Sequence, residues 1–317
     1  AKIYADSLID ADGHIKTMKY LSFNIDNVNG GKILFDLYAQ TGDERYKIAM
    51  DTLRKQMAEQ PRTSEGGFWH KLRYPHQMWL DGIFMASPYL VQYGATFNEP
   101  ALFDEATKQI LLINSKTYDP ATGLFYHGWD ESREQKWSNP ETGCSPNFWS
   151  RSIGWYGAAI VDVLDFLPQE TAGRDSIIQI LQGLAKAIVK YQDPSSGTWY
   201  QVTDQGAREG NYLESSATAL FIYTLAKAIN KGYIGNEYIE PTQKAFDGMV
   251  KTFTRLEEDG SYTITNCCAV AGLGGDSKRY RDGSFEYYIS EPIIENDPKS
   301  VGSFILAAIE YEKMTKK

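Results

Sequence analysis

Residues 118–127 read Tyr-Asp-Pro-Ala-Thr-Gly-Leu-Phe-Tyr-His, and a similar stretch, Gln-Asp-Pro-Ser-Ser-Gly-Thr-Trp-Tyr-Gln, occupies residues 192–201. In both, Asp-Pro-x-x-Gly is typical of a tight turn, because proline fixes φ and glycine accepts a positive φ. A glycine with aromatic residues after it also occurs in residues 66–70 and 260–264. This recurrence indicates a repeated supersecondary unit.

The segments that flank these turns predict two kinds of helix. Before each turn, apolar residues recur at helical spacing on one face and charged residues cover the other, which predicts half-exposed helices. The apolar stripes are Tyr46, Met50, Leu53 and Met57; Phe103, Ala106, Ile110 and Ile113; Ile177, Leu181, Leu184 and Ile188; and Phe246, Met249 and Phe253. After each turn the residues are small or apolar nearly all round, which predicts buried helices.

This alternation predicts an all-α fold of two concentric rings, an (α/α)6 barrel or six-hairpin toroid. The periodicity gives about ten helices, beginning near residues 27–40, where a complete barrel has twelve. We therefore expect the first hairpin to be incomplete in this chain. No linker interrupts the sequence, so residues 1–317 should form one domain. Short strands are expected at 199–203 and 262–266.

Composition excludes several functional classes. The net charge of −9 and the absence of a basic stripe argue against nucleic acid. No apolar run is long enough to span a membrane, and the three cysteines and four histidines lack metal-ligand spacing. We expect no metal, no cofactor and a monomer. No signal peptide is recognisable, and either the bacterial cytoplasm or the periplasm is compatible with the sequence.

Two carboxylates lie inside aromatic clusters, Asp81 in Trp-Leu-Asp-Gly and Asp130 in His-Gly-Trp-Asp. Apolar neighbours disfavour the charged form of a carboxyl group and prepare it for acid–base chemistry. Flat aromatic faces beside carboxylates also suit a sugar ring. Alternatively, each aspartate caps a helix and each tryptophan fills the core. Because the two segments share the repeated frame, their positions favour a carbohydrate-active site on one rim of the toroid.

Longer segments resemble the unsaturated rhamnogalacturonyl hydrolases, glycoside hydrolase family 105, which is related to the family 88 unsaturated glucuronyl hydrolases. The segments are residues 65–71, 74–82, 124–131, 142–155, 197–201, 211–216 and 297–304. The resemblance implies a toroid fold, no cofactor, and removal of a Δ4,5-unsaturated galacturonic acid from lyase-generated oligosaccharides. It further implies hydration of the C4=C5 double bond, with Asp130 as general acid and base and Asp81 as the partnering carboxylate.

The resemblance also implies a set of substrate-binding residues: His76, Gln77, Trp79, His127, Trp129, Trp149, Arg151 and Trp155. The Arg151 fork suits a uronate carboxylate and would offset the acidic charge of the chain locally. Alternatively, Arg151 pairs with Asp162 or Glu141 and holds an inner helix. Residues 272–297, which include Arg279, Tyr280 and Arg281, are expected to select the sugar beyond the bond.

Three other functions stay open on the sequence alone. One is an unsaturated glucuronyl hydrolase acting on glycosaminoglycan or ulvan-type fragments, with the same fold and chemistry. Another is a non-catalytic sugar-binding toroid, which the presence of both Asp81 and Asp130 disfavours. The last is an α/α scaffold for protein partners, which the aromatic residues of the rim disfavour.

Overall fold

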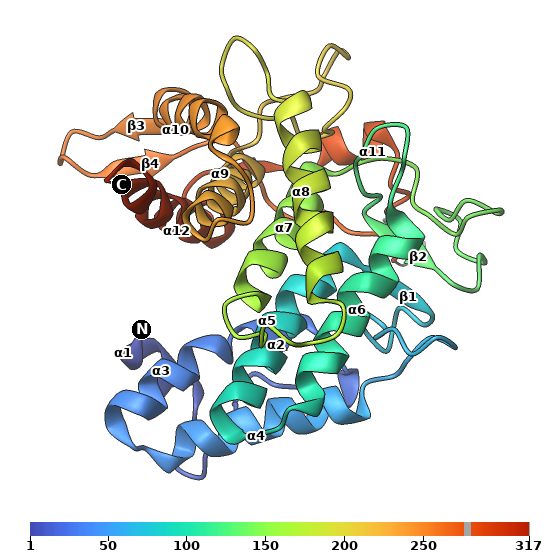
Figure 1. Ribbon diagram of the computed structural model, residues 1–317, viewed down its shortest axis with the longest axis vertical. Coiled ribbons are helices and arrows are strands. Elements are labelled where there is room, and N and C mark those ends of the chain that lie inside the picture. The colour runs from blue at the N-terminus through green and yellow to red at the C-terminus, as the bar shows by residue number, and fades with distance from the viewer. Residues whose placement is uncertain (276–279, 317) are drawn as a thin grey trace.

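The computed structural model describes residues 1–275 and 280–316, and most of these residues are helical (Figure 1). The longer helices are α3 (Lys32–Thr41), α4 (Glu44–Glu59), α5 (Leu80–Phe97), α6 (Ala101–Thr117), α7 (Ser150–Val163), α8 (Arg174–Lys190), α9 (Ser215–Asn230), α10 (Ile239–Phe253) and α12 (Pro298–Thr315). Shorter helices are α1 (Lys2–Leu8), η1 (Tyr20–Ser22), α2 (Asp26–Asn29), η2 (Asn236–Tyr238) and α11 (Phe285–Ser290).

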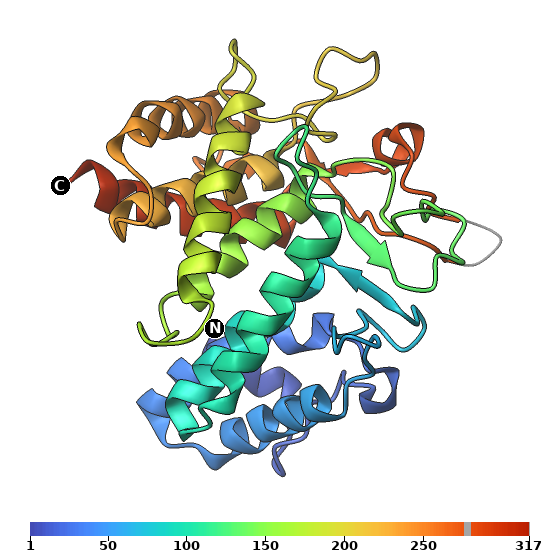
Figure 2. The same ribbon diagram turned by 45° about the vertical axis from the view of Figure 1, so that its right-hand side comes forward.

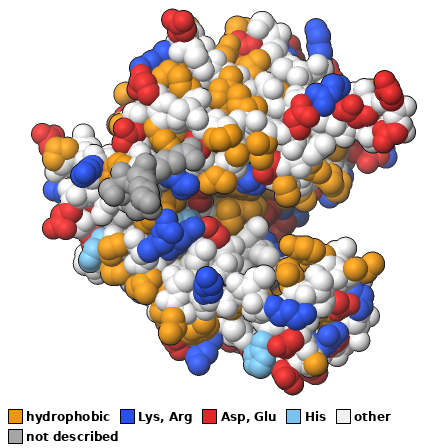
Figure 3. All heavy atoms as spheres, turned by 180° about the vertical axis from the view of Figure 1, so that it is seen from behind, with side chains coloured by type: hydrophobic (Ala, Val, Ile, Leu, Met, Phe, Trp, Pro, Cys, Tyr) orange, Lys and Arg blue, Asp and Glu red, His pale blue; other side chains and the backbone are white. Residues whose placement is uncertain are grey.

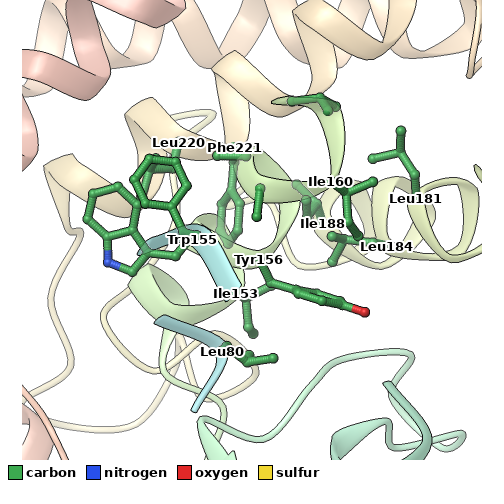
Figure 4. Packing of buried hydrophobic residues seen from close by; sticks show 14 of the residues in the cluster. Leu80, Ile153, Trp155, Tyr156, Ile160, Leu181, Leu184, Ile188, Leu220 and Phe221 are labelled. Carbon is green, nitrogen blue, oxygen red and sulfur yellow. The ribbon is translucent and has the colours of Figure 1, made fainter. Parts of the chain in front are cut away.

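Inner and outer helices alternate along the chain, as the sequence predicts. In α7 every residue except Asp162 is buried, whereas α8 buries a single face that includes Ile177, Leu181 and Ile188. The inner helices α5, α7, α9 and α12 pack successively against one another. Figure 4 shows how the α7 residues Trp155 and Tyr156 point to different sides of that helix within this core.

The first inner helix is divided into two pieces. The sequence predicts one helix near residues 27–40, but α2 ends at Asn29 and α3 begins at Lys32. Gly31 lies between them, and a Cβ atom there would come within 2.5 Å of Leu53 and 2.8 Å of Tyr89. The close approach of α4 and α5 therefore explains the glycine, and the backbone at Gly30 and Gly31 stays right-handed between the two pieces.

The ring of inner helices is open on one side. In the part of the chain that the structure describes, α12 and α3 do not pack extensively against each other. The two helices lie at opposite ends of the ring (Figure 1), and a notch separates the two ends when the molecule is seen from behind (Figure 3). On α12, the side chains of Ile305, Leu306 and Ile309 are exposed.

The predicted turns are present. Gly123 and Gly197 have φ angles of +80° and +76°. In the first turn the Asp119 carboxylate accepts hydrogen bonds from the backbone N–H and hydroxyl of Thr122, and Asp193 accepts equivalent bonds from Ser196. The Asp-Pro-x-x-Gly pattern thus encodes an aspartate-stabilised loop followed by an aromatic residue that enters the core.

The strands are short and lie in the loops. The antiparallel pairs are β1 (Gln77–Trp79) with β2 (Gly128–Asp130), β3 (Thr254–Leu256) with β4 (Tyr262–Ile264), and β5 (Cys267–Cys268) with β6 (Ile293–Ile294). The expected strand at 262–266 is therefore present as β4. The one expected at 199–203 is wrong, because Tyr200 and Val202 form only isolated bridges, to Leu213 and Trp149.

Candidate active site at the helix N-termini

The pairing of β1 with β2 joins the two loops that carry Asp81 and Asp130. Gln77 lies opposite Asp130, and Trp79 lies opposite Gly128. Helix α5 begins directly after β1, and the N–H of Leu80 donates to the carbonyl of His127 at 3.0 Å. Figure 2 shows the two strands side by side. Segments distant in sequence therefore converge where α5 begins.

Asp81, in the first turn of α5, faces His127. The Asp81 Oδ2 atom lies 3.1 Å from His127 Nε2, and the side chains are 13% and 0% exposed. The two atoms do not form a well-directed hydrogen bond in this conformation. Such a loose contact is common in ligand-free active sites. On the other side of the ring, His127 Nδ1 lies 2.8 Å from the hydroxyl of Tyr288.

An aromatic wall encloses His127. The rings of Trp149 and Tyr288 are stacked with centroids 5.9 Å apart, and the His127 ring lies 4.7 Å from Trp149. Gln201 holds both sides of this wall, because it accepts from Trp149 Nε1 at 3.1 Å and donates to the Tyr288 carbonyl at 3.1 Å. Burial raises the pKa of Tyr288 well above its usual value, so this hydroxyl stays protonated.

Asp130 is completely buried. Its Oδ1 atom accepts hydrogen bonds from the N–H of Ser132 at 3.0 Å and from the hydroxyl of Ser132 at 2.7 Å. Its Oδ2 atom accepts from the N–H of Gln135 at 3.0 Å. Both carboxylate oxygens are therefore engaged by the loop that follows β2, in contrast to the partly exposed Asp81.

Arg151 lies beneath the site, and a substrate carboxylate cannot reach it in this conformation. The side chain is 1% exposed, and its guanidinium donates to the hydroxyl of Ser216 and to the Cys268 carbonyl. The direct contact with substrate stays a prediction that needs the site to open, because the guanidinium is enclosed here by the β5 backbone and α9. Its acidic neighbour is Glu214, at 3.9 Å, rather than Asp162 or Glu141.

The electrostatic setting of Arg151 keeps it charged. Burial alone would lower its pKa, but Glu214, the two cysteines of β5 and Asp81 together raise it above its usual value. Arg151 thus carries a positive charge that interacts electrostatically with Asp81.

Trp129 does not face the site. Side chains alternate along a strand, so Trp129 and its partner Met78 point away from the face that carries Asp130 and Gln77. Both belong to the main hydrophobic core, and Trp129 Nε1 donates to the Thr142 carbonyl at 3.2 Å. The strand register, which only the folded chain establishes, turns the Trp129 ring inward, and its contact with substrate stays a prediction.

Trp79 and Trp155 are also covered. The rings of His70 and Tyr74 stack on Trp79 at centroid distances of 4.4 and 4.9 Å, which leaves Trp79 5% exposed. Trp155 stacks on Phe84 at 4.5 Å, one helical turn further along the inner helices. Open stacking platforms for a sugar are therefore not available at either ring in this conformation.

His76 lies on the surface. It adopts a left-handed backbone conformation with φ of +61°, and its side chain is 46% exposed. Its Nδ1 atom lies 3.5 Å from Glu131, and its ring contacts Trp69 at 4.6 Å. It is thus the most accessible of the proposed binding residues.

Sequence reasoning missed three polar residues around the site. Tyr288 contacts His127, and Asp26 lies 3.2 Å from His70, which stacks on Trp79. Glu214 is buried beside Arg151. His70 and Glu214 lie within the segments that carry the family resemblance. The sequence around Tyr288 contains no motif that points to the site, apart from its place in residues 272–297. Arg279 of that stretch lies outside the described residues.

Two further observations bear on function. Among residues 1–275 and 280–316, no helix is long and apolar enough to cross a membrane. In the same part of the chain, only Asp10, Asp12 and His14 come close enough together to ligate one cation. Asp10 instead accepts hydrogen bonds from the N–H groups of Asp12 and His14, so this exposed cluster forms a turn.

Comparison with known proteins decides the family. The family model described as Glycosyl Hydrolase Family 88 matches residues 1–315. The chain belongs to this family. A family 105 glycoside hydrolase from Clostridium acetobutylicum has a similar structure, with a TM-score of 0.95 and 45% identity over 97% of this chain and 85% of that one.

Two curated relatives are similar in sequence. Protein Atu3128 of Agrobacterium fabrum is 37% identical over 230 residues, which cover 71% of this chain and 97% of that protein. The unsaturated rhamnogalacturonyl hydrolase YesR of Bacillus subtilis is 26% identical over 243 residues, 75% of this chain and 65% of YesR. The resemblance to family 105 is confirmed, and so is the all-α toroid, which an unsaturated glucuronyl hydrolase shares at 15% identity and a TM-score of 0.66.

Proposed function

We propose that this family 88 hydrolase removes a Δ4,5-unsaturated galacturonic acid from the non-reducing end of rhamnogalacturonan oligosaccharides that lyases have cut. The likeness to YesR, which is named an unsaturated rhamnogalacturonyl hydrolase, supports this substrate class. The contact between Asp81 and His127 at the start of α5 is the observation that carries the proposal. It provides a partly exposed carboxylate in an otherwise buried, aromatic setting.

The reaction proposed is hydration of a vinyl ether. A carboxylic acid donates a proton to C4, positive charge develops at C5, and water adds there. The resulting hemiketal opens and releases the remaining sugar, so that one water is consumed and the acid is regenerated. The rule that relates carboxylate separation to retention or inversion concerns attack at the anomeric carbon and does not apply.

In this scheme Asp130 is the general acid and base, and Asp81 is the negative partner that stabilises charge at C5. The three hydrogen bonds on Asp130 set a condition for its role. Because Asp130 is completely buried, substrate binding has to expose it and displace one of the donors from Ser132 or Gln135 before Asp130 can exchange a proton with C4. Asp81 needs no such release, because its Oδ2 atom has no directed hydrogen bond.

The remaining residues would act around these two. The carboxylate of the uronic acid would lie within the electric field of Arg151. Because the Arg151 side chain is enclosed by protein, water screens this field little. His76, at the exposed edge, would contact the sugar beyond the bond that breaks. Gln77 would position Trp79, whose Nε1 atom donates to it at 3.2 Å.

The test follows the ultraviolet absorbance of the conjugated C4=C5 bond on a panel of lyase-generated disaccharides. We expect the absorbance to disappear with the rhamnose-linked member. Loss with a glucuronate-linked member instead would support an unsaturated glucuronyl hydrolase. No loss with any member, while the sugars still bind, would support a non-catalytic toroid.

Matched variants test the two aspartates. Asp81→Asn and Asp130→Asn should each abolish turnover while disaccharide binding persists. The control is Asp247→Asn, because Asp247 is exposed on the outer helix α10 and should leave turnover unchanged. Full activity of Asp130→Asn, together with a lowered unfolding midpoint, would mean that Asp130 only stabilises its loop.

A further inference from the structure

Tyr288 and Asp81 hold the two nitrogen atoms of one buried imidazole. The Tyr288 hydroxyl lies 2.8 Å from His127 Nδ1, and Asp81 Oδ2 lies 3.1 Å from His127 Nε2. Tyr288 belongs to the short helix α11, and Asp81 to the first turn of α5. Helix α11 lies on the same side of the ring as β1 and β2 (Figures 1 and 2).

The positions of the hydrogen atoms follow from the partners. Tyr288 is fully buried, and its hydroxyl hydrogen has one acceptor among the described residues, His127 Nδ1. If Nδ1 carried the hydrogen instead, the phenol hydrogen would have no acceptor in this part of the structure, and a buried donor without a partner costs roughly 1–3 kcal/mol. A bare Nε2 atom would then also face the carboxylate oxygen of Asp81.

Donation from Tyr288 to Nδ1 avoids both problems. The hydrogen of the neutral imidazole then sits on Nε2, the nitrogen that lies 3.1 Å from Asp81 Oδ2, where it suits a carboxylate acceptor. Burial keeps the phenol protonated and thereby preserves the donor. The Tyr288 hydroxyl and both nitrogen atoms of His127 then each have a role.

We propose that Tyr288 is a positioning residue that fixes His127 as the Nε2–H tautomer and thereby holds Asp81 as the negative group of the site. The effect of Tyr288 on catalysis rests on the proposed function, whereas the assignment of the His127 tautomer does not. The neighbouring Tyr287 accepts from the N–H of Gly272 at 3.0 Å, so α11 is also tied to the stretch that precedes it. The stretch 272–297, which contains Tyr288, would thus help to hold Asp81 as the negative group, in addition to any part in the choice of substrate.

The tautomer can be measured directly. The chain has only four histidines, so protein labelled with 15N at histidine gives four imidazole patterns in a long-range proton–nitrogen correlation spectrum. The pattern of His127 is identified by its loss in His127→Asn. In the wild-type protein at mildly alkaline pH, we expect hydrogen on Nε2. Hydrogen on Nδ1 would overturn the proposal even if no variant could be made.

A variant pair tests the role of the phenol. Tyr288→Phe should change the His127 nitrogen shifts or mix the two tautomers, whereas Tyr156→Phe should leave them unchanged. Tyr156 is an equally buried tyrosine whose hydroxyl donates to the Ile110 carbonyl at 3.1 Å, in the core. An unchanged His127 pattern in folded Tyr288→Phe would contradict the assigned role.

Activity distinguishes this inference from the proposed function. In Tyr288→Phe, kcat on the unsaturated disaccharide should fall by at least tenfold while KM changes little, because Tyr288 acts through His127 and touches no substrate. Unchanged kcat in an active enzyme would refute the positioning role. If the wild-type protein consumes no member of the panel but His127 still carries its hydrogen on Nε2, the proposed function fails and the assigned tautomer stands.

Discussion

Replacement of Glu214 by alanine should destabilise the protein strongly, because this one buried carboxylate has three tasks. It caps α9 by accepting from the N–H of Ala217 at 2.7 Å. It accepts from the N–H of Cys268 at 2.9 Å, and it is the acidic neighbour of Arg151 at 3.9 Å. The side chain has no exposed area.

The magnitude follows from these losses. An N-cap contributes about 1 kcal/mol, and a buried N–H left without a partner costs roughly 1–3 kcal/mol. Removing one partner of a buried ion pair costs about 3–5 kcal/mol in total. Since these losses overlap, we expect a decrease of about 4 kcal/mol in the free energy of unfolding. With an unfolding entropy of about 2 cal/mol/K per residue, this corresponds to a decrease of about 6 °C in Tm for 317 residues.

Urea unfolding followed by tryptophan fluorescence and by far-ultraviolet circular dichroism measures this loss. The control is Glu209→Ala, because Glu209 is exposed in the loop before α9 and its removal should change the free energy by less than about 0.5 kcal/mol. Glu214→Gln should lie between the two, since its amide oxygen still accepts one backbone hydrogen bond. A decrease below about 1 kcal/mol for Glu214→Ala would refute the reasoning.

Three further predictions concern the site and the ring. Gly143→Ala should lower the free energy of unfolding by at least about 1–2 kcal/mol, because φ at Gly143 is +80° and a Cβ atom would lie 2.5 Å from the carbonyl oxygen of Asp130. Urea titration measures this loss, and an unchanged midpoint would contradict the expected backbone strain. Trp129→Phe should lose about 1 kcal/mol with its hydrogen bond but keep the KM of the wild type, and a large increase in KM would show that Trp129 touches substrate. Burial lowers the pKa of Lys32 from 10.5 to about 8. Below pH 8 the charged Lys32 therefore destabilises the folded state. This destabilisation disappears between pH 8 and 10.5, because in this range the unfolded chain binds more protons than the folded chain. Lys32→Met should therefore be more stable than the wild type near pH 7, with an advantage that shrinks as pH rises through this range in paired urea titrations; a constant difference would contradict the shift.

The fold was largely predictable because its signals are local. The turn at Asp193 and Gly197 depends on residues within one short stretch, and the stripe from Ile177 to Ile188 depends on helical spacing alone. The need for glycine at position 31 was not predictable, since it depends on Leu53 and Tyr89, which approach Gly31 from two other helices.

The site was predictable where sequence neighbours decide it. His127 and Asp130 were recognisable from one short segment, and Asp81 from another, but their relation depends on the pairing of β1 with β2. The same pairing turns Trp129 into the core. The enclosure of Arg151 depends on β5 and α9, which are distant in sequence, so a motif could identify the residue but not its exposure.

The caps of the inner helices divide into two kinds. Helices α9 and α12 begin with carboxylate caps, Glu214 and Asp297, which accept from their first backbone N–H groups. Helices α5 and α7 instead begin after Trp79 and Trp149, and neither has a side-chain cap. An uncapped N-terminus retains a partial positive charge of about half a unit from the helix dipole. Asp81 stands in the first turn of α5, whereas α7 has no acidic residue in its first turn. A protein with a net charge of −9 thus keeps the positive end of α7 without a neighbouring carboxylate of its own helix, and this end would draw an anion to the rim against the repulsion of the whole molecule.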